Sequence, residues 1–299
     1  MIYTLSLNPA MDLHLSVKRL DYGEIYKTYN QHAFAGGKGI NVSLCLKNLG
    51  INSIALGFTG GFVGDFLKKE LDQKKIKHDF VDIEGTNRIN VKIDGVKEIQ
   101  LNGVGPKISK AEFQKLLKKL NKIKHNDYLI ISGNIPNSIS LDTLTKKINE
   151  LSRKGVKIVV DTTGEALLKF LKCKPILIKP NRAEAEEVLG EKLDNTEHLE
   201  KGAFKLHKLG AKNVIISLGK NGALLYDGDE WHHAKSIKID TQTTVGAGDT
   251  LLAAFISQYS KNKNVDACLK YAVIASAATC KLGYIANKND IDLLIKRNK

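Results

Sequence analysis

Short apolar stretches alternate with amphipathic stretches along most of this 299-residue chain, and no other feature constrains its fold as strongly. The apolar stretches have the length and punctuation of buried strands, whereas the longer stretches repeat apolar residues with the period of a helix. Expected strands cover residues 52–57, 127–132, 156–160, 175–178 and 212–217, and expected helices cover 42–49, 63–74, 141–153, 183–189 and 265–281. This order predicts an α/β fold with a doubly wound, mostly parallel sheet and helices on both faces.

Two segments, residues 13–35 and 86–101, break the alternation because they are β-rich and contain no helical pattern. We expect them to form a small sheet that projects from a single domain spanning residues 1–299, where it would act as a lid over an active site. A small isolated sheet is poorly stable, so its exposed apolar face would suit pairing with a second copy of the chain. The lid therefore predicts a homodimer.

Composition argues against several classes of function. The formal net charge is +14, but the lysines are scattered along helix faces and aromatic residues make up only 6% of the chain. Without a basic patch or a stacking platform, we expect no specific nucleic-acid binding. No run of about 18 apolar residues occurs, so we expect no membrane span. The four cysteines form no CxxC pair, which favours reduced thiols in a cytoplasmic protein.

The run Thr244-Val245-Gly246-Ala247-Gly248-Asp249 precedes a small, apolar helical stretch. Its glycines allow the backbone to approach a ligand closely, and the unpaired N–H groups at a helix start favour an anion. Asp249 beside such an anion hole is a candidate general base, which would take a proton from an alcohol that attacks a phosphoryl group. A tight turn with Asp249 stabilising the first helical turn is the alternative.

A second glycine cluster, Gly36-Gly37-Lys38-Gly39, leads through Asn41 into the expected helix 42–49. Lys38 can reach a phosphate, and Asn41 can donate to and accept from sugar hydroxyls. Asp12 follows the first strand, at the kind of edge where ligands of open α/β sheets bind. Arg88 begins an expected lid strand, where it would either clamp a phosphate or lie exposed. Because these polar residues and glycines are all expected at strand ends, they favour a ligand site there.

The polar segment Lys179-Pro180-Asn181-Arg182-Ala183-Glu184 follows an expected strand and opens a helix. Asn181 and Glu184 are three residues apart and share a face of the first turn. Their spacing suits a magnesium site that acts through water and suits a capping box equally well. The later run Ser217-Leu218-Gly219-Lys220-Asn221-Gly222 ends a strand with a turn that would either cover a nucleotide or join a hairpin.

Eight ordered stretches of the chain together resemble the ribokinase-like (PfkB) carbohydrate kinases over essentially the full length. The stretches are 4–12, 35–42, 86–92, 132–136, 161–164, 179–184, 217–222 and 244–249. They are most similar to the branch that contains bacterial 1-phosphofructokinase and tagatose-6-phosphate kinase. The resemblance implies a three-layer α/β/α sandwich with a β-sheet lid, often a dimer, and ATP with Mg²⁺ as the phosphoryl donor.

The resemblance also implies a role for each matching residue. Asp249 would be the general base, with Gly246, Ala247 and Gly248 around the anion hole. Sugar binding would fall to Asp12, Gly36, Gly37, Asn41 and Asn134, while Lys38 and Arg88 would face the phosphate that the sugar already carries. Nucleotide binding would fall to Lys179, Asn181, Glu184, Ser217, Leu218, Gly219, Lys220, Asn221, Gly222 and Gly248, with Glu184 holding Mg²⁺ through water.

The residues of stretches 35–42 and 86–92 resemble those of fructose-1-phosphate kinases more than those of tagatose-6-phosphate kinases. The expected substrate is therefore D-fructose 1-phosphate, which would become D-fructose 1,6-bisphosphate. Conversion of tagatose 6-phosphate to tagatose 1,6-bisphosphate is the alternative, and a non-catalytic sensor on the same fold is a more distant one. The chain departs from the family pattern at Asn134-Ile135-Pro136-Asn137-Ser138, where the usual glycine after the proline is missing. Residues 241–244 also lack the aspartate that many relatives carry before the base.

Overall fold

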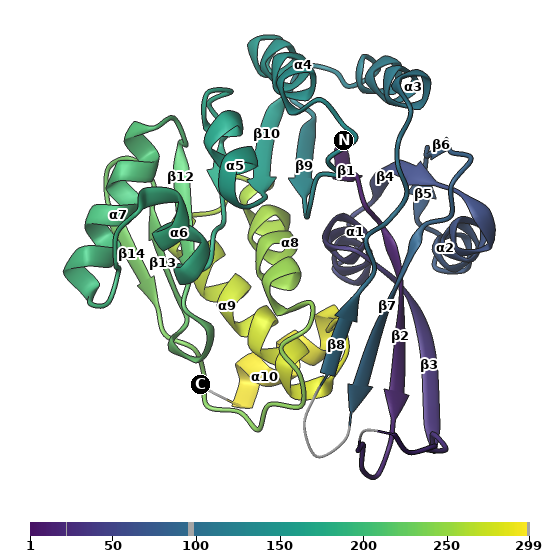
Figure 1. Cartoon of the computed structure of the whole chain (residues 1–299). Coiled ribbons are helices and arrows are strands. Elements are labelled where there is room, and N and C mark those ends of the chain that lie inside the picture. Colours follow the sequence, from purple (N-terminus) through teal and green to yellow (C-terminus); the bar gives the residue numbers. More distant parts are fainter. Residues whose placement is uncertain (22, 95–98, 298–299) are drawn as a thin grey trace.

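A long, mostly parallel sheet forms the centre of the computed structural model, which describes residues 1–21, 23–94 and 99–297 (Figure 1). Its strand order is β14-β13-β12-β11-β10-β9-β1-β4-β5, with β6 also pairing with β4. The strands are β1 (Ile2–Ser6), β4 (Ser53–Thr59), β5 (Lys77–His78), β6 (Val81–Asp82), β9 (Tyr128–Ser132), β10 (Lys157–Asp161), β11 (Leu177–Ile178), β12 (Asn213–Ser217), β13 (Ala223–Tyr226) and β14 (Trp231–Ala234). Only β12–β13 and β13–β14 pair in antiparallel fashion among these strands.

Helices cover both faces of this sheet, because alternate residues of the strands pack into two separate apolar clusters. One face carries α1 (Lys38–Asn48), α2 (Gly61–Gln73), α8 (Ala247–Tyr259), α9 (Val265–Leu282) and α10 (Lys288–Arg297). The other carries α3 (Lys110–Leu120), α4 (Leu141–Arg153), α5 (Gly164–Leu171), α6 (Arg182–Leu189) and α7 (Thr196–Lys208). The expected doubly wound, three-layer α/β/α sandwich is therefore confirmed.

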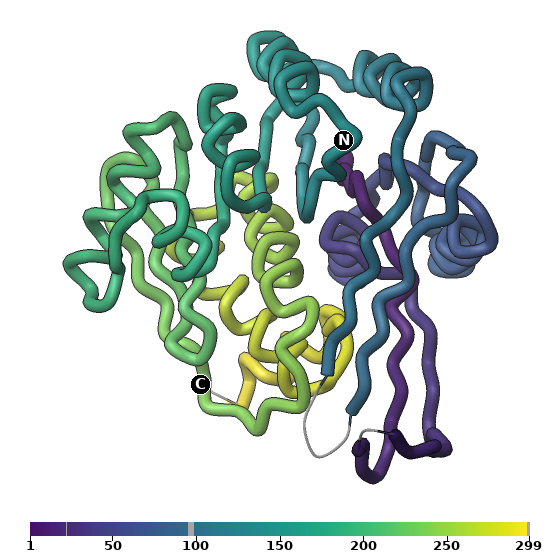
Figure 2. The backbone as a smooth tube through the Cα atoms, viewed as in Figure 1, coloured from purple at the N-terminus to yellow at the C-terminus, as the bar shows by residue number. Residues whose placement is uncertain are grey.

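A second sheet of β3 (Asn30–Gly36), β2 (Ala10–Ser16), β7 (Arg88–Asp94) and β8 (Ile99–Asn102), in that order, projects from the body as the expected lid. The backbone trace shows residues 10–16 and 30–36 running beside 88–94 and 99–102, although they are far apart in sequence (Figure 2). Residue 22 and residues 95–98 of the expected lid segments lie outside the described residues.

The two faces of the lid differ in chemistry because side chains alternate along each strand. Strand register places Leu13, Val91 and Leu101 in one row, and it places Leu15, Ile93 and Ile99 in the next, so this face is apolar. The opposite face carries the row Phe34, Asp12, Asn90 and Asn102, followed by the row His32, His14, Lys92 and Gln100. The lid thus has one polar face and one apolar face.

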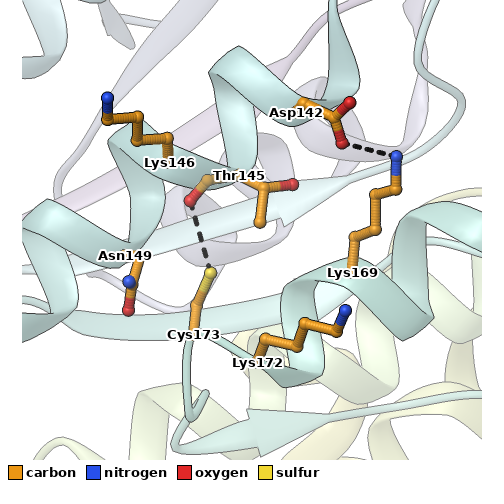
Figure 3. A pocket seen from close by; sticks show the side chains of 7 residues that line it. All are labelled: Asp142, Thr145, Lys146, Asn149, Lys169, Lys172 and Cys173. Carbon is orange, nitrogen blue, oxygen red and sulfur yellow. Dashed lines mark hydrogen bonds and ion pairs between the residues drawn. The ribbon is translucent and has the colours of Figure 1, made fainter.

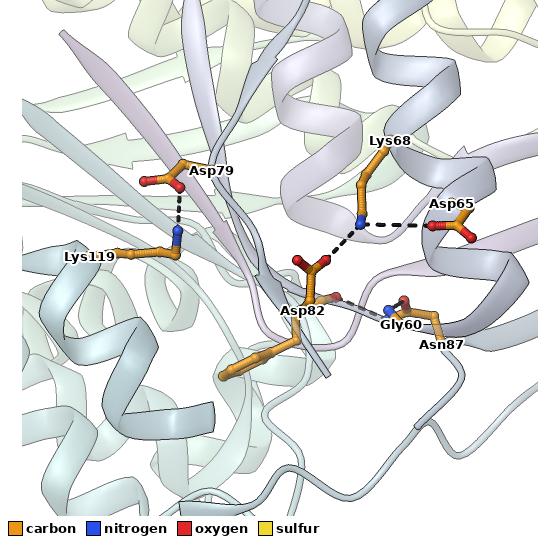
Figure 4. Close-up of polar contacts among 8 residues, drawn as sticks. Gly60, Asp65, Lys68, Asp79, Asp82, Asn87 and Lys119 are labelled. Carbon is orange, nitrogen blue, oxygen red and sulfur yellow. Dashed lines mark hydrogen bonds and ion pairs between the residues drawn. The ribbon is translucent and has the colours of Figure 1, made fainter. Parts of the chain in front are cut away.

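Asn87 fixes the base of the lid just before β7 begins (Figure 4). Its side-chain oxygen accepts a hydrogen bond from the backbone N–H of Gly60 at 2.8 Å, and its amide nitrogen donates to the carbonyl of Phe58 at 3.0 Å. Because Asn87 is buried, both bonds are shielded from water. The neighbouring ion pairs of Lys68 with Asp65 and Asp82 lie at the surface of the same region.

Most predicted elements agree with the structure to within two or three residues, but α1 begins four residues earlier than expected, at Lys38. Gly37 adopts a φ of 100°, which turns the chain sharply out of β3 and lets the helix start at once. Gly39 lies inside the helix because a side chain there would come within 2.9 Å of Ser6 on β1. Among the described residues, no helix has both the length and the apolar character needed to cross a membrane.

Candidate active site

Asp249 lies in the first turn of α8, which begins immediately after Gly246 in a left-handed conformation with φ 74°. The carboxyl group is buried, with 6% of the residue exposed, and it makes no helix-capping hydrogen bond. Its oxygen Oδ2 instead accepts a hydrogen bond from the side chain of Asn41 on α1 at 2.8 Å. Asp249 thus lies in the first turn of α8, as both interpretations of the motif require, and its side chain also contacts α1. The backbone N–H of Ala247 donates to the carbonyl of Thr244 at 3.3 Å, so within the described residues the N–H groups of Gly248 and Asp249 are the ones left without an acceptor in the helix. A helix start of this kind favours an anion.

The surroundings of Asp249 make it a stronger base than an exposed carboxylate. Burial and the nearby charge of Asp161 raise the pKa of Asp249 to about 6, against the opposing effects of Asn41, Lys38 and Lys179. A base whose pKa lies close to neutral is ionised at physiological pH and still binds a proton well. The arrangement is therefore suited to accepting a proton from an alcohol.

A group of buried charges lies beside Asp249 at the carboxyl ends of β10 and β11. Asp161 ends β10, and its Oδ1 lies 3.2 Å from the ammonium of Lys179 and 3.6 Å from that of Lys38. Neither oxygen of Asp161 accepts a hydrogen bond of regular geometry, although both are buried. A side chain added at Gly248 would come within 3.4 Å of the ammonium of Lys179, so this ammonium lies beside the start of α8. Sequence reasoning gave Asp161 no role, although its position at a strand end was a usable signal.

Lys38 extends toward two carboxylates at the sheet edge. Its ammonium lies 3.6 Å from Asp161 Oδ1 and 3.6 Å from Glu184 Oε1. As the first residue of α1, Lys38 packs against Gly133 after β9, and this position carries its side chain toward the carboxylates. Burial tends to lower the pKa of Lys38, but Asp161, Glu184 and Asp249 outweigh it and raise the value.

Asn181 and Glu184 form the capping box at the start of α6. The backbone N–H of Glu184 donates to Asn181 at 2.9 Å, and the backbone N–H of Asn181 donates to Glu184 Oε2 at 2.8 Å. The second oxygen of Glu184, Oε1, faces Lys38 and is not used by the cap. Capping and a ligand-facing role are thus compatible. Among the described residues, no group of three or more His, Cys, Asp or Glu side chains gathers as a metal site.

The polar face of the lid brings Asp12 together with two residues that sequence reasoning left without a role. Asn90 donates to Asp12 Oδ1 at 2.7 Å, and Lys92 donates to Oδ2 at 3.2 Å. The carboxyl group lies over Gly36, where an added side chain would be only 2.5 Å away. Alternating polar residues in the sequence Arg88-Ile89-Asn90-Val91-Lys92 were the signal that could have identified this face.

Arg88 and the 217–222 turn also have defined places. The guanidinium of Arg88 donates to the carbonyls of Asn8 at 3.2 Å and Gly103 at 3.3 Å, across the connections between lid and body. The turn joins β12 to β13 as a hairpin and contains a 3₁₀ helix at Gly219–Asn221. Ser217 forms a parallel bridge with Asn181, so the turn lies next to the start of α6. Asn134 is exposed in the loop after β9.

One surface hollow is separate from these residues. It has a volume of about 340 Å³ and lies between α4 and α5 (Figure 3), and its walls contain none of the expected site residues. It is lined by Asp142, Thr145, Lys146, Asn149, Lys169, Lys172 and Cys173. The candidate active site is defined by the side chains that converge at the start of α8.

Comparison with known proteins agrees with this geometry. A family model described as pfkB family carbohydrate kinase matches residues 5–291. A 1-phosphofructokinase of Borreliella burgdorferi is 38% identical over 99% of this chain and 96% of its own length. A D-tagatose-1-phosphate kinase of Bacillus licheniformis is 36% identical over 93% of this chain and 92% of its own. The latter is named for tagatose 1-phosphate and not for the tagatose 6-phosphate of the sequence-based alternative.

The solved structures include Escherichia coli phosphofructokinase-2 in complex with substrates and products. It superposes with a TM-score of 0.95 at 26% identity, over 99% of this chain and 98% of its own. Asp249, the start of α8 and the second sheet thus belong to a chain that matches kinases along almost its whole length. The chain belongs to the pfkB family of carbohydrate kinases, which transfer a phosphoryl group from ATP to a sugar hydroxyl.

Proposed function

We propose that this protein is a 1-phosphofructokinase, which uses ATP to phosphorylate D-fructose 1-phosphate at its 6-hydroxyl. The observation that carries the proposal is the buried Asp249, held by Asn41 in the first turn of α8, a helix start that favours an anion. The names and coverage of the relatives, among them the 38% identical 1-phosphofructokinase, favour this sugar phosphate. The whole chain acts as one kinase domain, with residues 13–35 and 86–101 contributing the lid.

The chain's residues perform the transfer in one displacement. Asp249 accepts the proton of the sugar hydroxyl, and the hydroxyl oxygen bonds to the terminal phosphorus of ATP while the bond to ADP breaks. The first N–H groups of α8, around Gly246, Ala247 and Gly248, stabilise charge on the transferring group. Closure of the lid excludes water that would otherwise compete with the sugar.

The nucleotide binds on the side of Asp161, Lys179 and the 217–222 turn. The ammonium groups of Lys38 and Lys179 lie at this edge, where they would face the phosphates of the nucleotide while sharing their charge with Asp161. Oε1 of Glu184 is not used by the capping box, so this carboxylate suits Mg²⁺ that retains several waters. When bound, the ion neutralises charge on the triphosphate.

The decisive experiment is a side-by-side measurement of kcat/KM with ATP for fructose 1-phosphate, fructose 6-phosphate, tagatose 1-phosphate and tagatose 6-phosphate. Fructose 1-phosphate is expected to give the highest value. A higher value for another sugar phosphate would reassign the substrate within the same reaction. If ATP is not consumed with any of the four sugar phosphates, the result would favour the non-catalytic sensor.

We also infer that the lid pairs two copies of the chain in the cytoplasm, where its free cysteines stay reduced. The apolar lid face supports pairing because Leu101 is 57% exposed and Ile99 is 37% exposed. One of the Escherichia coli phosphofructokinase-2 structures is described as a tetrameric inhibited form. Sedimentation of the wild type and of Leu101→Glu tests the pairing, since a charge on this face should leave monomers.

A further inference from the structure

Lys92 is one of the few buried lysines of the chain, with 6% of the residue exposed on lid strand β7. Lysines are almost never fully buried unless they are paired, and this one donates to Asp12 Oδ2 at 3.2 Å. An ammonium group carries three N–H donors, and this bond accounts for one of them. Among the described residues Asp12 is its one ion-pair partner, so the ammonium can bind a further anion at this nearly dry position on the polar face of the lid.

Lys92 lies beside Asp12, on the part of the site that is proposed to hold the sugar. Asp12 contacts Gly36, which immediately precedes the start of α1, and Asn41 in the first turn of α1 holds Asp249. Asn90 and Lys92 are two residues apart on β7 and reach opposite oxygens of Asp12. The lid face that holds Asp12 is thus connected through α1 to Asp249.

The other cations of the site already have partners. Lys38 faces Asp161 and Glu184, and Arg88 spans the carbonyls of Asn8 and Gly103. Arg88 lies at the connections between lid and body, and Lys92 lies on the polar face of the lid. Together they carry two positive charges, whereas Asp12 carries one negative charge. A buried excess of positive charge favours a substrate that carries negative charge of its own.

We propose that Lys92 recognises the phosphate that the sugar already carries, while its bond to Asp12 aligns that carboxylate for the sugar hydroxyls. The inference rests on the proposed function and assigns Lys92 the role that the resemblance gave to Lys38. Charge-assisted hydrogen bonds from a desolvated ammonium to a phosphate are among the stronger polar contacts in proteins. Lys92 therefore discriminates a phosphorylated ketohexose from the free sugar.

The test compares the wild type with Lys92→Gln, whose amide can still donate to Asp12 but carries no charge. Binding of fructose 1-phosphate and of fructose is measured by calorimetry without ATP, and KM for ATP is measured separately. Lys92→Gln is expected to weaken fructose 1-phosphate binding by about 30-fold, the loss typical of a bond to a charged group, with a much smaller effect on fructose. KM for ATP should stay within about twofold of the wild type, because the nucleotide site proposed above lies at Asp161 and Lys179.

Two further variants separate recognition from folding. Lys18→Met, at an exposed lysine next to β2, is the matched control and should leave both affinities unchanged. Lys92→Arg keeps the charge and should retain most of the preference for the phosphorylated sugar, and it replaces Lys92→Gln if the latter fails to fold. Equal weakening for both sugars in Lys92→Gln, or in Lys92→Arg with thermal stability unchanged, would show that Lys92 only supports Asp12.

The same measurements distinguish this inference from the proposed function. If the wild type phosphorylates another ketohexose phosphate instead, the substrate assignment fails, and the ratio between that sugar phosphate and its free sugar tests Lys92 in the same way. If the wild type turns over fructose 1-phosphate but Lys92→Gln keeps its preference, only the role of Lys92 is wrong.

Discussion

Replacing Asp249 by asparagine should remove catalysis and at the same time stabilise the unliganded protein. The pKa of this carboxyl is raised from 3.8 to about 6, chiefly by burial and by Asp161. A carboxyl whose pKa is raised on folding binds its proton more tightly in the folded state, so ionisation opposes folding. The shift of about two units corresponds to about 3 kcal/mol of lost stability once the group is fully ionised.

The destabilisation by ionised Asp249 can be tested directly, because it changes the free energy of unfolding in a pH-dependent way. The destabilisation is absent below the unfolded pKa of 3.8, develops as the pH rises toward 6, and is fully present above that value. Asparagine is neutral throughout and can still accept the hydrogen bond from Asn41. We therefore expect Asp249→Asn to be more stable than the wild type by about 3 kcal/mol at pH 7.5 and by about half of that at pH 5.

The assay is urea unfolding of both proteins at pH 7.5, 6 and 5 without ligands, combined with steady-state kinetics. Turnover of the variant should fall by about 10³-fold, as expected for loss of a general base, while ATP binding is retained. Asp65→Asn, whose carboxyl is 81% exposed on α2, should change neither property. A variant that is less stable than the wild type, or a stability difference that does not change with pH, would refute the reasoning.

Three further perturbations test other parts of the site. Asn41→Leu removes a bond that lowers the pKa of Asp249, so the acidic limb of kcat/KM should move to higher pH than in the wild type; an unchanged limb would separate the base from Asn41. Gly36→Ala would place a methyl group 2.5 Å from the carboxyl of Asp12, so KM for the sugar should rise by about tenfold while KM for ATP does not; equal changes in both would contradict this. Asn87→Ala leaves the two buried groups at the base of the lid unpaired and should lower the free energy of unfolding by about 2–4 kcal/mol, whereas the exposed Asn52→Ala should not; similar urea midpoints would argue against a fixed lid base.

The alternating pattern of the sequence was sufficient to predict the architecture, because strand and helix periodicities are local properties. Helix α4 begins and ends where its apolar repeat predicts, at Leu141 and Arg153. The start of α1 was wrong because glycines usually indicate a loop, and only packing against β1 explains Gly39 inside a helix. Strand β11 is shorter than expected because it pairs only through Leu177 and Ile178.

The site could be predicted less completely, because its geometry depends on contacts between distant residues. Glycine-rich runs at helix starts identified Asp249, but its partner Asn41 is 208 residues away in sequence. The direction of Lys38 depends on Asp161 and Glu184, which a local motif cannot place in space. The pairing of Lys92 with Asp12 spans 80 residues and appears only once the register between β2 and β7 is known.

Gly37 is the only residue between the last residue of β3 and the first residue of α1. Helix α1, which follows β3 in Figure 1, carries Asn41, and the side-chain amide of Asn41 binds Asp249. A movement of the β3 edge of the sheet would therefore be passed directly to the residue that holds this carboxylate. We therefore expect binding of a sugar against the polar lid face and alignment of Asp249 to be coupled through α1.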